Sequence, residues 1–112
     1  MTEEGYRQAW AELRTARARL LLPADIRAYA ELSFGMAFHL IAIGAQHRHG
    51  LHREQHEGLG RWLRDRGHPD TAGASVQLES LRTGRWYGRQ GNGNAAAAID
   101  ELLAAIESWA LA

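Results

Sequence analysis

Three arginines and two aromatic residues lie close together in residues 81–89, which read Leu-Arg-Thr-Gly-Arg-Trp-Tyr-Gly-Arg. Because a guanidinium forms paired hydrogen bonds with phosphate and an aromatic face stacks on a base, this pattern favours an RNA or nucleotide ligand. It predicts these ligand-binding residues: Arg82, Arg85, Tyr87 and Arg89. The alternative is a helix end whose aromatic rings fill the interior while the arginines point to water.

Histidine is the second residue type here that could take part in catalysis or metal binding. Four histidines fall within ten residues: His47, His49, His52 and His56. On a helix, His52 and His56 would share a face and could hold a metal ion together. However, position 53 is Arg rather than the Glu of a metalloprotease helix, and no third ligand is evident. We therefore predict no metal site. His39, inside an apolar run, is expected to be a hydrogen-bonded core residue or to face a dimer interface.

Composition excludes several kinds of chemistry. The 112 residues include no cysteine, and all thirteen basic residues are arginine. This rules out disulfides, thiolate metal sites, a cysteine nucleophile and Schiff-base chemistry on lysine. No serine–histidine–acid order is present either, and we expect no cofactor. Residues 48–89 hold eight arginines against five acidic residues, whereas residues 90–112 hold three acidic residues and no base, so the middle of the chain is the candidate for contact with an anion.

Apolar residues recur with helical spacing along nearly the whole chain, and no strand pattern competes. We expect five helices. The first covers about residues 6–20 and is ended by Pro23, the second runs from near Asp25 to about His49 and is closed by Gly50, and the third covers about 53–66. The fourth is capped by Asp70 or Thr71 and turns Ala74, Leu78 and Leu81 inward, and the fifth is capped by Asn94 after a turn-rich loop over 88–94. This predicts an all-α fold, an antiparallel up-and-down helical bundle of four to five helices, as one domain over residues 1–112.

The stretch over residues 34–45 is apolar on nearly every side, which indicates a helix buried on every side. Such a helix is either central to the domain or contributes half its surface to a dimer, and we expect a homodimer through it. Gly35 and Gly44 are best explained by the close approach of another helix. The run is shorter than the ~20 residues of a membrane span, and the acidic start is unlike a signal peptide. We expect a cytoplasmic protein without membrane contact.

Several segments together resemble the small prokaryotic HEPN-domain family. Residues 33–40 read Ser-Phe-Gly-Met-Ala-Phe-His-Leu, Gly50-Leu51 follows, residues 56–59 read His-Glu-Gly-Leu, and residues 78–88 read Leu-Glu-Ser-Leu-Arg-Thr-Gly-Arg-Trp-Tyr-Gly. The resemblance covers roughly residues 5–111. It implies a helical bundle, often homodimeric, in RNA- or nucleotide-linked systems such as toxin–antitoxin pairs or modules that accompany nucleotidyltransferases.

Some HEPN domains are metal-independent RNases that use an Arg followed by a His four to six residues later. That motif would fall at Arg85, where Tyr87 and Gln90 stand in place of the histidine. The resemblance therefore favours a non-catalytic module that binds RNA, a nucleotide or a protein partner. The alternatives are a metal-independent RNase and a purely structural oligomerisation module. The candidate catalytic residues of the RNase are Arg85, Arg82, His56 and His68.

Overall fold

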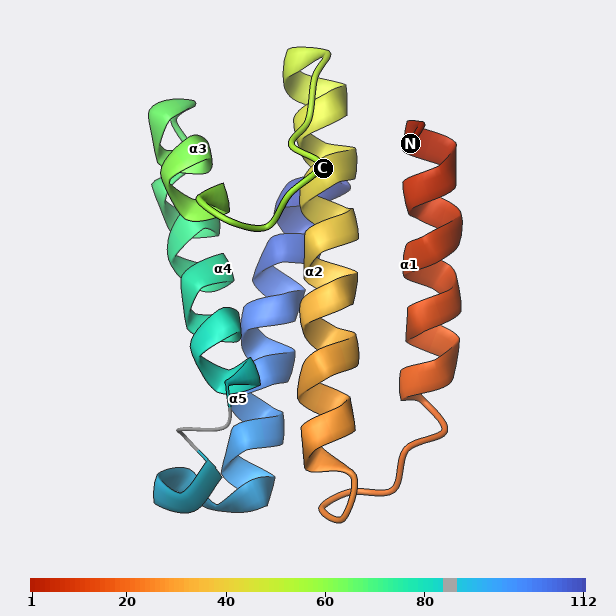
Figure 1. The fold of residues 1–112 in the computed structure, drawn as a ribbon, viewed down its shortest axis with the longest axis vertical. Helices are drawn as coiled ribbons and strands as arrows, with labels where there is room; N and C mark the ends of the chain where they lie inside the picture. The colour runs from red at the N-terminus through yellow and green to blue at the C-terminus, as the bar shows by residue number, and fades with distance from the viewer. Residues whose placement is uncertain (84–86) are drawn as a thin grey trace.

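Five helices form the fold in a computed structural model, which describes the backbone of residues 1–83 and 87–112 and the side chains of residues 1–83 and 94–112. They are α1 (Glu3–Arg17), α2 (Ile26–His49), α3 (Leu59–Asp65), α4 (Pro69–Arg82) and α5 (Tyr87–Ala110). The four long helices alternate in direction: α1 and α4 run down the view of Figure 1, and α2 and α5 run up. No strand occurs in the described ranges. The predicted all-α antiparallel bundle is confirmed.

Helix α2 is the centre of the bundle, because it contacts α1, α4 and α5, while the short α3 packs on α4 (Figure 1). Its fully buried side chains include Met36, Leu40, Ile41 and Ile43. The chain's own helices therefore cover most of the apolar run at 34–45, as in the first of the two predicted alternatives. By length and composition α2 also passes as a membrane span, but most of that stretch is buried inside the bundle.

Two glycines of α2 lie where a neighbouring helix comes close, as predicted. A Cβ on Gly44 would lie 2.5 Å from the Trp109 ring and 3.0 Å from the Cα of Ala110, both in α5. A Cβ on Gly35 would lie 3.0 Å from Leu13 of α1. Glycine disfavours helix by about 1 kcal/mol relative to alanine, and here it permits packing that a side chain would block.

A polar network ties α1 to α2 and α5. The Arg17 guanidinium donates to Ser33 Oγ at 2.9 Å and to Asp100 Oδ1 at 3.1 Å, and it lies 4.5 Å from the centroid of the Tyr29 ring. The Tyr29 hydroxyl donates to the same Asp100 carboxylate. Burial and this hydrogen bond raise the pKa of Tyr29 to about 12. The network gives the hydroxyl of Ser33, which is fully buried, a hydrogen-bond partner.

Two helices begin earlier than predicted because of local caps. Helix α1 starts at Glu3 rather than near Tyr6, since Thr2 Oγ1 accepts a hydrogen bond from the Gly5 amide at 3.0 Å. Helix α4 starts at Pro69, with His68 as its N-cap, so the prediction of Asp70 or Thr71 as the cap is wrong. Proline suits the first turn because its fixed φ is helical and its missing N–H would have no partner there.

Helix α5 also begins earlier than predicted. The expected loop over 88–94 and the expected N-cap at Asn94 are both wrong, because the backbone is helical from Tyr87 onward. The alanine-rich part of α5 is buried along one side, including Ala95, Ile99 and Ile106. Extending an existing helix by one residue costs far less than nucleating a new one, so a stable helix can extend into a segment of poor propensity.

His39 is not the hydrogen-bonded core residue that was expected. Its Nδ1 atom is buried and has no hydrogen-bond partner among the described residues. The imidazole instead contacts the rings of Tyr6 and Phe38, at centroid distances of 5.6 and 5.9 Å. Burial lowers the pKa of His39. The side chain is thus held as a neutral ring between two aromatic neighbours.

Candidate functional site

Arg82, the first of the predicted ligand-binding residues, lies in the last turn of α4 with its guanidinium over the ring of Phe34 in α2. The guanidinium carbon is 4.3 Å from the ring centroid, and Nη1 is 3.9 Å from Glu31 Oε2. The Arg82 side chain is 28% exposed and that of Glu31 is 54% exposed. An ion pair this long and this exposed is weak, whereas the contact with the aromatic ring is a cation–π interaction that favours this position of the guanidinium.

His56 reaches the same ring from another part of the chain. It lies in the segment between α2 and α3, and its imidazole meets the Phe34 ring edge-on, at a centroid distance of 5.7 Å and an interplanar angle of 83°. Its Nδ1 is 4.0 Å from Glu79 Oε1 of α4, with both side chains about half exposed. We refer to Glu31, Phe34, His56, Glu79 and Arg82 as the Phe34 cluster.

The segment that carries His56 is not the start of a helix. A helix within the predicted range 53–66 is present and ends near Arg66 as predicted, but its predicted start is wrong, because α3 begins only at Leu59, after Gly58 with φ of 69°. In place of a helical turn, Arg53 Nε donates to the carbonyl of Glu57 at 2.8 Å. The segment over residues 53–57 is therefore held by a bond from a side chain to the backbone rather than by helical backbone bonds. His52 and His56 therefore do not share a helix face, and the metal pair considered for them does not form.

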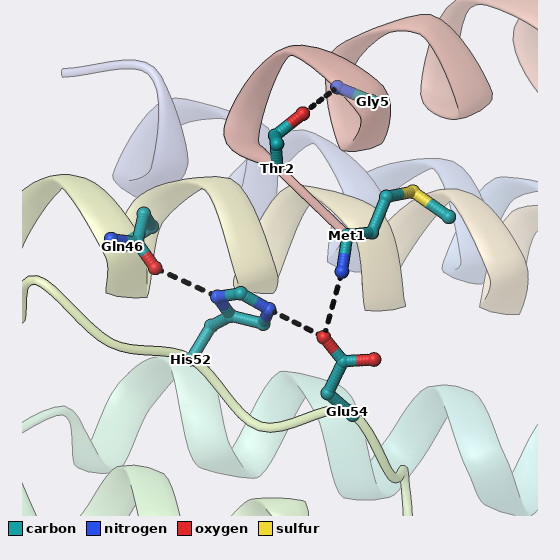
Figure 2. A network of polar contacts seen from close by, with 6 residues as sticks. All are labelled: Met1, Thr2, Gly5, Gln46, His52 and Glu54. Atoms are coloured by element: carbon teal, nitrogen blue, oxygen red, sulfur yellow. Dashed lines mark hydrogen bonds and ion pairs between the residues drawn. The ribbon is translucent and has the colours of Figure 1, made fainter.

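His52 fixes this segment to the rest of the bundle, as Figure 2 shows. Its Nδ1 lies 2.8 Å from Gln46 Oε1 of α2, and its Nε2 lies 2.9 Å from Glu54 Oε1, which also contacts the amino group of Met1 at 3.0 Å. The hydrogen bond from His52 is the main reason that the pKa of Glu54 is lowered. The His52 ring also packs edge-on against Tyr6 of α1 at 5.0 Å. The segment that presents His56 is therefore attached to both α1 and α2.

The other predicted site residues do not all join the cluster. Arg85 lies outside the described residues, and Tyr87 and Arg89 lie on the first turn of α5, with side chains outside the described ones. His68 precedes α4, so the helix separates it from Arg82 by about 20 Å at a rise of about 1.5 Å per residue. The structure thus brings together Arg82 and His56 and separates both from His68.

The four clustered histidines have separate surroundings. His47 is exposed, His49 contacts His68, His52 contacts Glu54, and His56 contacts the Phe34 ring. Within the described ranges, no group of three or more His, Cys, Asp or Glu residues could hold a metal ion.

Three members of the Phe34 cluster were missed as site residues in the sequence. Phe34 was assigned to the apolar run, and Glu31 and Glu79 were not singled out. The spacing does carry a signal, since Glu31 precedes Phe34 by three residues and Glu79 precedes Arg82 by three. Residues three apart lie on one face of a helix, so each glutamate had to lie beside its neighbour in the cluster.

Comparisons with known proteins do not assign this chain to a family. No family model, no curated protein and no solved structure matches this chain.

Proposed function

We propose that this protein is a non-catalytic binding module for single-stranded RNA or a nucleotide, with the Phe34 cluster as its phosphate-binding surface. The observation that carries the proposal is the Arg82 guanidinium placed over the Phe34 ring, with its central carbon 4.3 Å from the ring centroid. A guanidinium restricted in this way binds phosphate with less loss of conformational entropy than a mobile one. The cytoplasm is the compartment in which we expect this role.

The charged groups around Arg82 allow a phosphate to replace Glu31 beside the guanidinium. Glu31 lies 3.9 Å from the guanidinium and is more than half exposed, so its carboxylate can return to water when a phosphate binds. A phosphate can then accept two hydrogen bonds from the guanidinium edge, an arrangement stronger than the long pair with Glu31. His56 contacts the same ring and can add an imidazole N–H as a further donor.

The sequence around Arg82 and the family resemblance support the same role. Arg85 follows Arg82 by three residues and Arg89 by seven, so further positive charge is close along the chain. A place beside a nucleotidyltransferase or in a toxin–antitoxin pair follows from the HEPN resemblance, as does a homodimer. Because the run over 34–45 is largely covered within one chain, a dimer would use the partly exposed side chains of this stretch, such as Phe38.

The binding proposal is tested by titrating a fluorescent single-stranded RNA with the protein and following anisotropy at low salt. Arg82→Met keeps the stem over Phe34 and removes the charged fork, so we expect affinity to fall about tenfold or more. Arg27→Met is the matched control, since Arg27 is exposed on the first turn of α2. Equal affinity for the Arg82→Met and Arg27→Met proteins would contradict the proposal.

A second candidate function, metal-independent RNA cleavage, is favoured by the contact between His56 and Glu79. With Nδ1 directed to the carboxylate, Nε2 of His56 is on the opposite side of the ring and can take the proton of a ribose 2′-hydroxyl. The resulting alkoxide would attack the adjacent phosphorus and break its bond to the 5′-oxygen of the next nucleotide, which takes a proton from water, giving a 2′,3′-cyclic phosphate. Arg82 would stabilise the charge on the phosphoryl oxygens.

An assay of RNA cleavage in excess EDTA distinguishes this second function from binding alone. If His56 is the base, His56→Ala should lower the rate about a hundredfold or more, while His47→Ala should leave it unchanged. Binding without cleavage by the unaltered protein would reject the RNase and leave the binding module.

A further inference from the structure

A second cluster of ring contacts closes the opposite end of the bundle. Trp109, in the last turn of α5, lies against Gly44 of α2. The guanidinium of Arg48 lies 4.5 Å from the Trp109 ring centroid and donates to the Trp109 carbonyl at 2.6 Å. His68, just before α4, meets the same ring at 5.0 Å and 68°. We refer to Gly44, Arg48, His49, His68 and Trp109 as the Trp109 cluster.

The hydrogen bonds of this cluster fix where its protons lie. Trp109 Nε1 contacts His68 Nδ1 at 3.3 Å, and because an indole nitrogen can only donate, His68 Nδ1 must be the acceptor. A neutral His68 then carries its proton on Nε2, which lies 2.9 Å from Nε2 of His49. His49 must accept there, so its own proton is on Nδ1. The chain of donors runs from Trp109 through His68 to His49.

This order of donors holds only while both imidazoles are neutral. A proton added to His68 would occupy Nδ1 and face the indole N–H, and a proton added to His49 would occupy Nε2 and face the N–H of His68. Either change places two N–H groups against each other and breaks one hydrogen bond of the chain.

We propose that the Trp109 cluster is an acid-sensitive contact that holds the last turn of α5 on α2 at neutral pH and releases it when His68 is protonated. The charged groups that face the histidine pair are Arg48 from α2 and, beside Trp109, Asp70 from α4. Burial is the main cause that lowers the pKa of His68, and the neighbouring His49 and Arg48 lower it further, which agrees with a neutral ring in the closed form.

Opening takes up one proton on His68, so the ratio of open to closed forms rises by up to about tenfold for each unit of falling pH. The contact depends on no ligand, so its test is independent of RNA binding.

The experiment uses the full chain labelled with 5-fluorotryptophan. Each of the four tryptophans of the chain then gives a ¹⁹F signal, and the Trp109→Phe variant identifies the signal of position 109. We expect that signal to shift between about pH 7.5 and about pH 5, the range in which histidines titrate. The Trp62 ring, which packs against Arg66 at 3.9 Å, serves as the internal reference. A signal of position 109 that does not move would overturn the proposal.

Variants assign the shift to the histidine pair. His68→Gln retains an oxygen that can accept from the indole but cannot gain charge, so the pH response of position 109 should be lost. His47→Gln, on the same exposed end of α2, should leave it unchanged. A full response in the His68→Gln protein would contradict the proposal. The ¹⁵N shifts of the unaltered protein give a second measurement, since they must show Nε2–H for His68 and Nδ1–H for His49 at about pH 7.5; any other pair of tautomers would overturn the proposal.

Discussion

The Phe34 and Trp109 clusters have the same three parts, an aromatic ring with an arginine over its face and a histidine against it, yet their polar contacts differ. In the Trp109 cluster the ring itself donates to His68, and Arg48 is bonded to a carbonyl at 2.6 Å. Phenylalanine has no polar side-chain atom, and among the side chains of residues 1–83 and 94–112 the polar groups that Arg82 and His56 face are carboxylates, at 3.9 and 4.0 Å. The donors of the Trp109 cluster have close partners, whereas those of the Phe34 cluster have only distant ones among these residues.

This difference explains why the two clusters suit different roles. A hydrogen bond from a charged group to a carbonyl contributes about 1.5–3 kcal/mol, whereas an exposed ion pair contributes about 0–1 kcal/mol. The Trp109 cluster is therefore expected to stabilise the fold, and the Phe34 cluster to contribute little to stability and more to binding.

The largest expected effect on stability comes from filling the space that Trp109 occupies. Gly44→Ala places a Cβ 2.5 Å from the Trp109 ring and 3.0 Å from backbone, so we expect the free energy of unfolding to fall by about 1–3 kcal/mol. Gly73→Ala is the matched control in α4, because nothing lies within 4 Å of its Cβ; it should raise stability by about 0.5–1 kcal/mol. Urea denaturation measures both, and a neutral Gly44→Ala would show that Trp109 is not seated as described.

A smaller effect separates the two arginines. We expect Arg48→Met to lower the free energy of unfolding by about 1–1.5 kcal/mol, because it removes the bond to the Trp109 carbonyl, which is weakened by the exposure of Arg48 to solvent. Arg82→Met should cost under about 1 kcal/mol, since only the long pair with Glu31 and the ring contact are affected. The same denaturation assay compares the two proteins, and equal losses would remove the distinction between the clusters.

The smallest expected effect is the pH dependence that His39 adds to that of His68. Burial lowers the pKa of both in the folded protein, so the unfolded chain binds more protons and stability falls as pH drops below about 6.5. Each group can contribute a slope of at most about 1.4 kcal/mol per pH unit. In the His39→Gln protein the slope should decrease while the ¹⁹F response of position 109 stays, and loss of that response would show that His39 belongs to the same acid-sensitive unit.

More of the fold than of the candidate site could be predicted from the sequence, and particular residues show why. Helical spacing identified the stripes that pack on α2, and the propensity cost of Gly44 pointed correctly to a close helix. The start of α3 could not be predicted, because the side chain of Arg53 bonds the backbone in place of a helical turn. Periodicity does not show such competition between side chain and backbone.

Only part of the candidate site could be predicted, because contacts between distant segments cannot be derived from residue type or spacing. Arg82 was found from residue type, because guanidinium chemistry is local to one side chain. Its partners Phe34 and His56 come from other segments, and their approach depends on how His52 holds the loop to α1 and α2 (Figure 2). His68 was grouped with Arg82 by chemistry alone, and the length of α4 separates them.

The most direct test of the central claim is a map of amide and side-chain NMR shifts as a short single-stranded RNA is added to the protein. We predict that signals of the Phe34 cluster, namely Glu31, Phe34, His56, Glu79 and Arg82, move together, while those of His68 and of Trp109 in α5 do not. Shifts confined to the Trp109 end, or no shifts at all, would contradict the assignment of the Phe34 cluster as the ligand-binding surface.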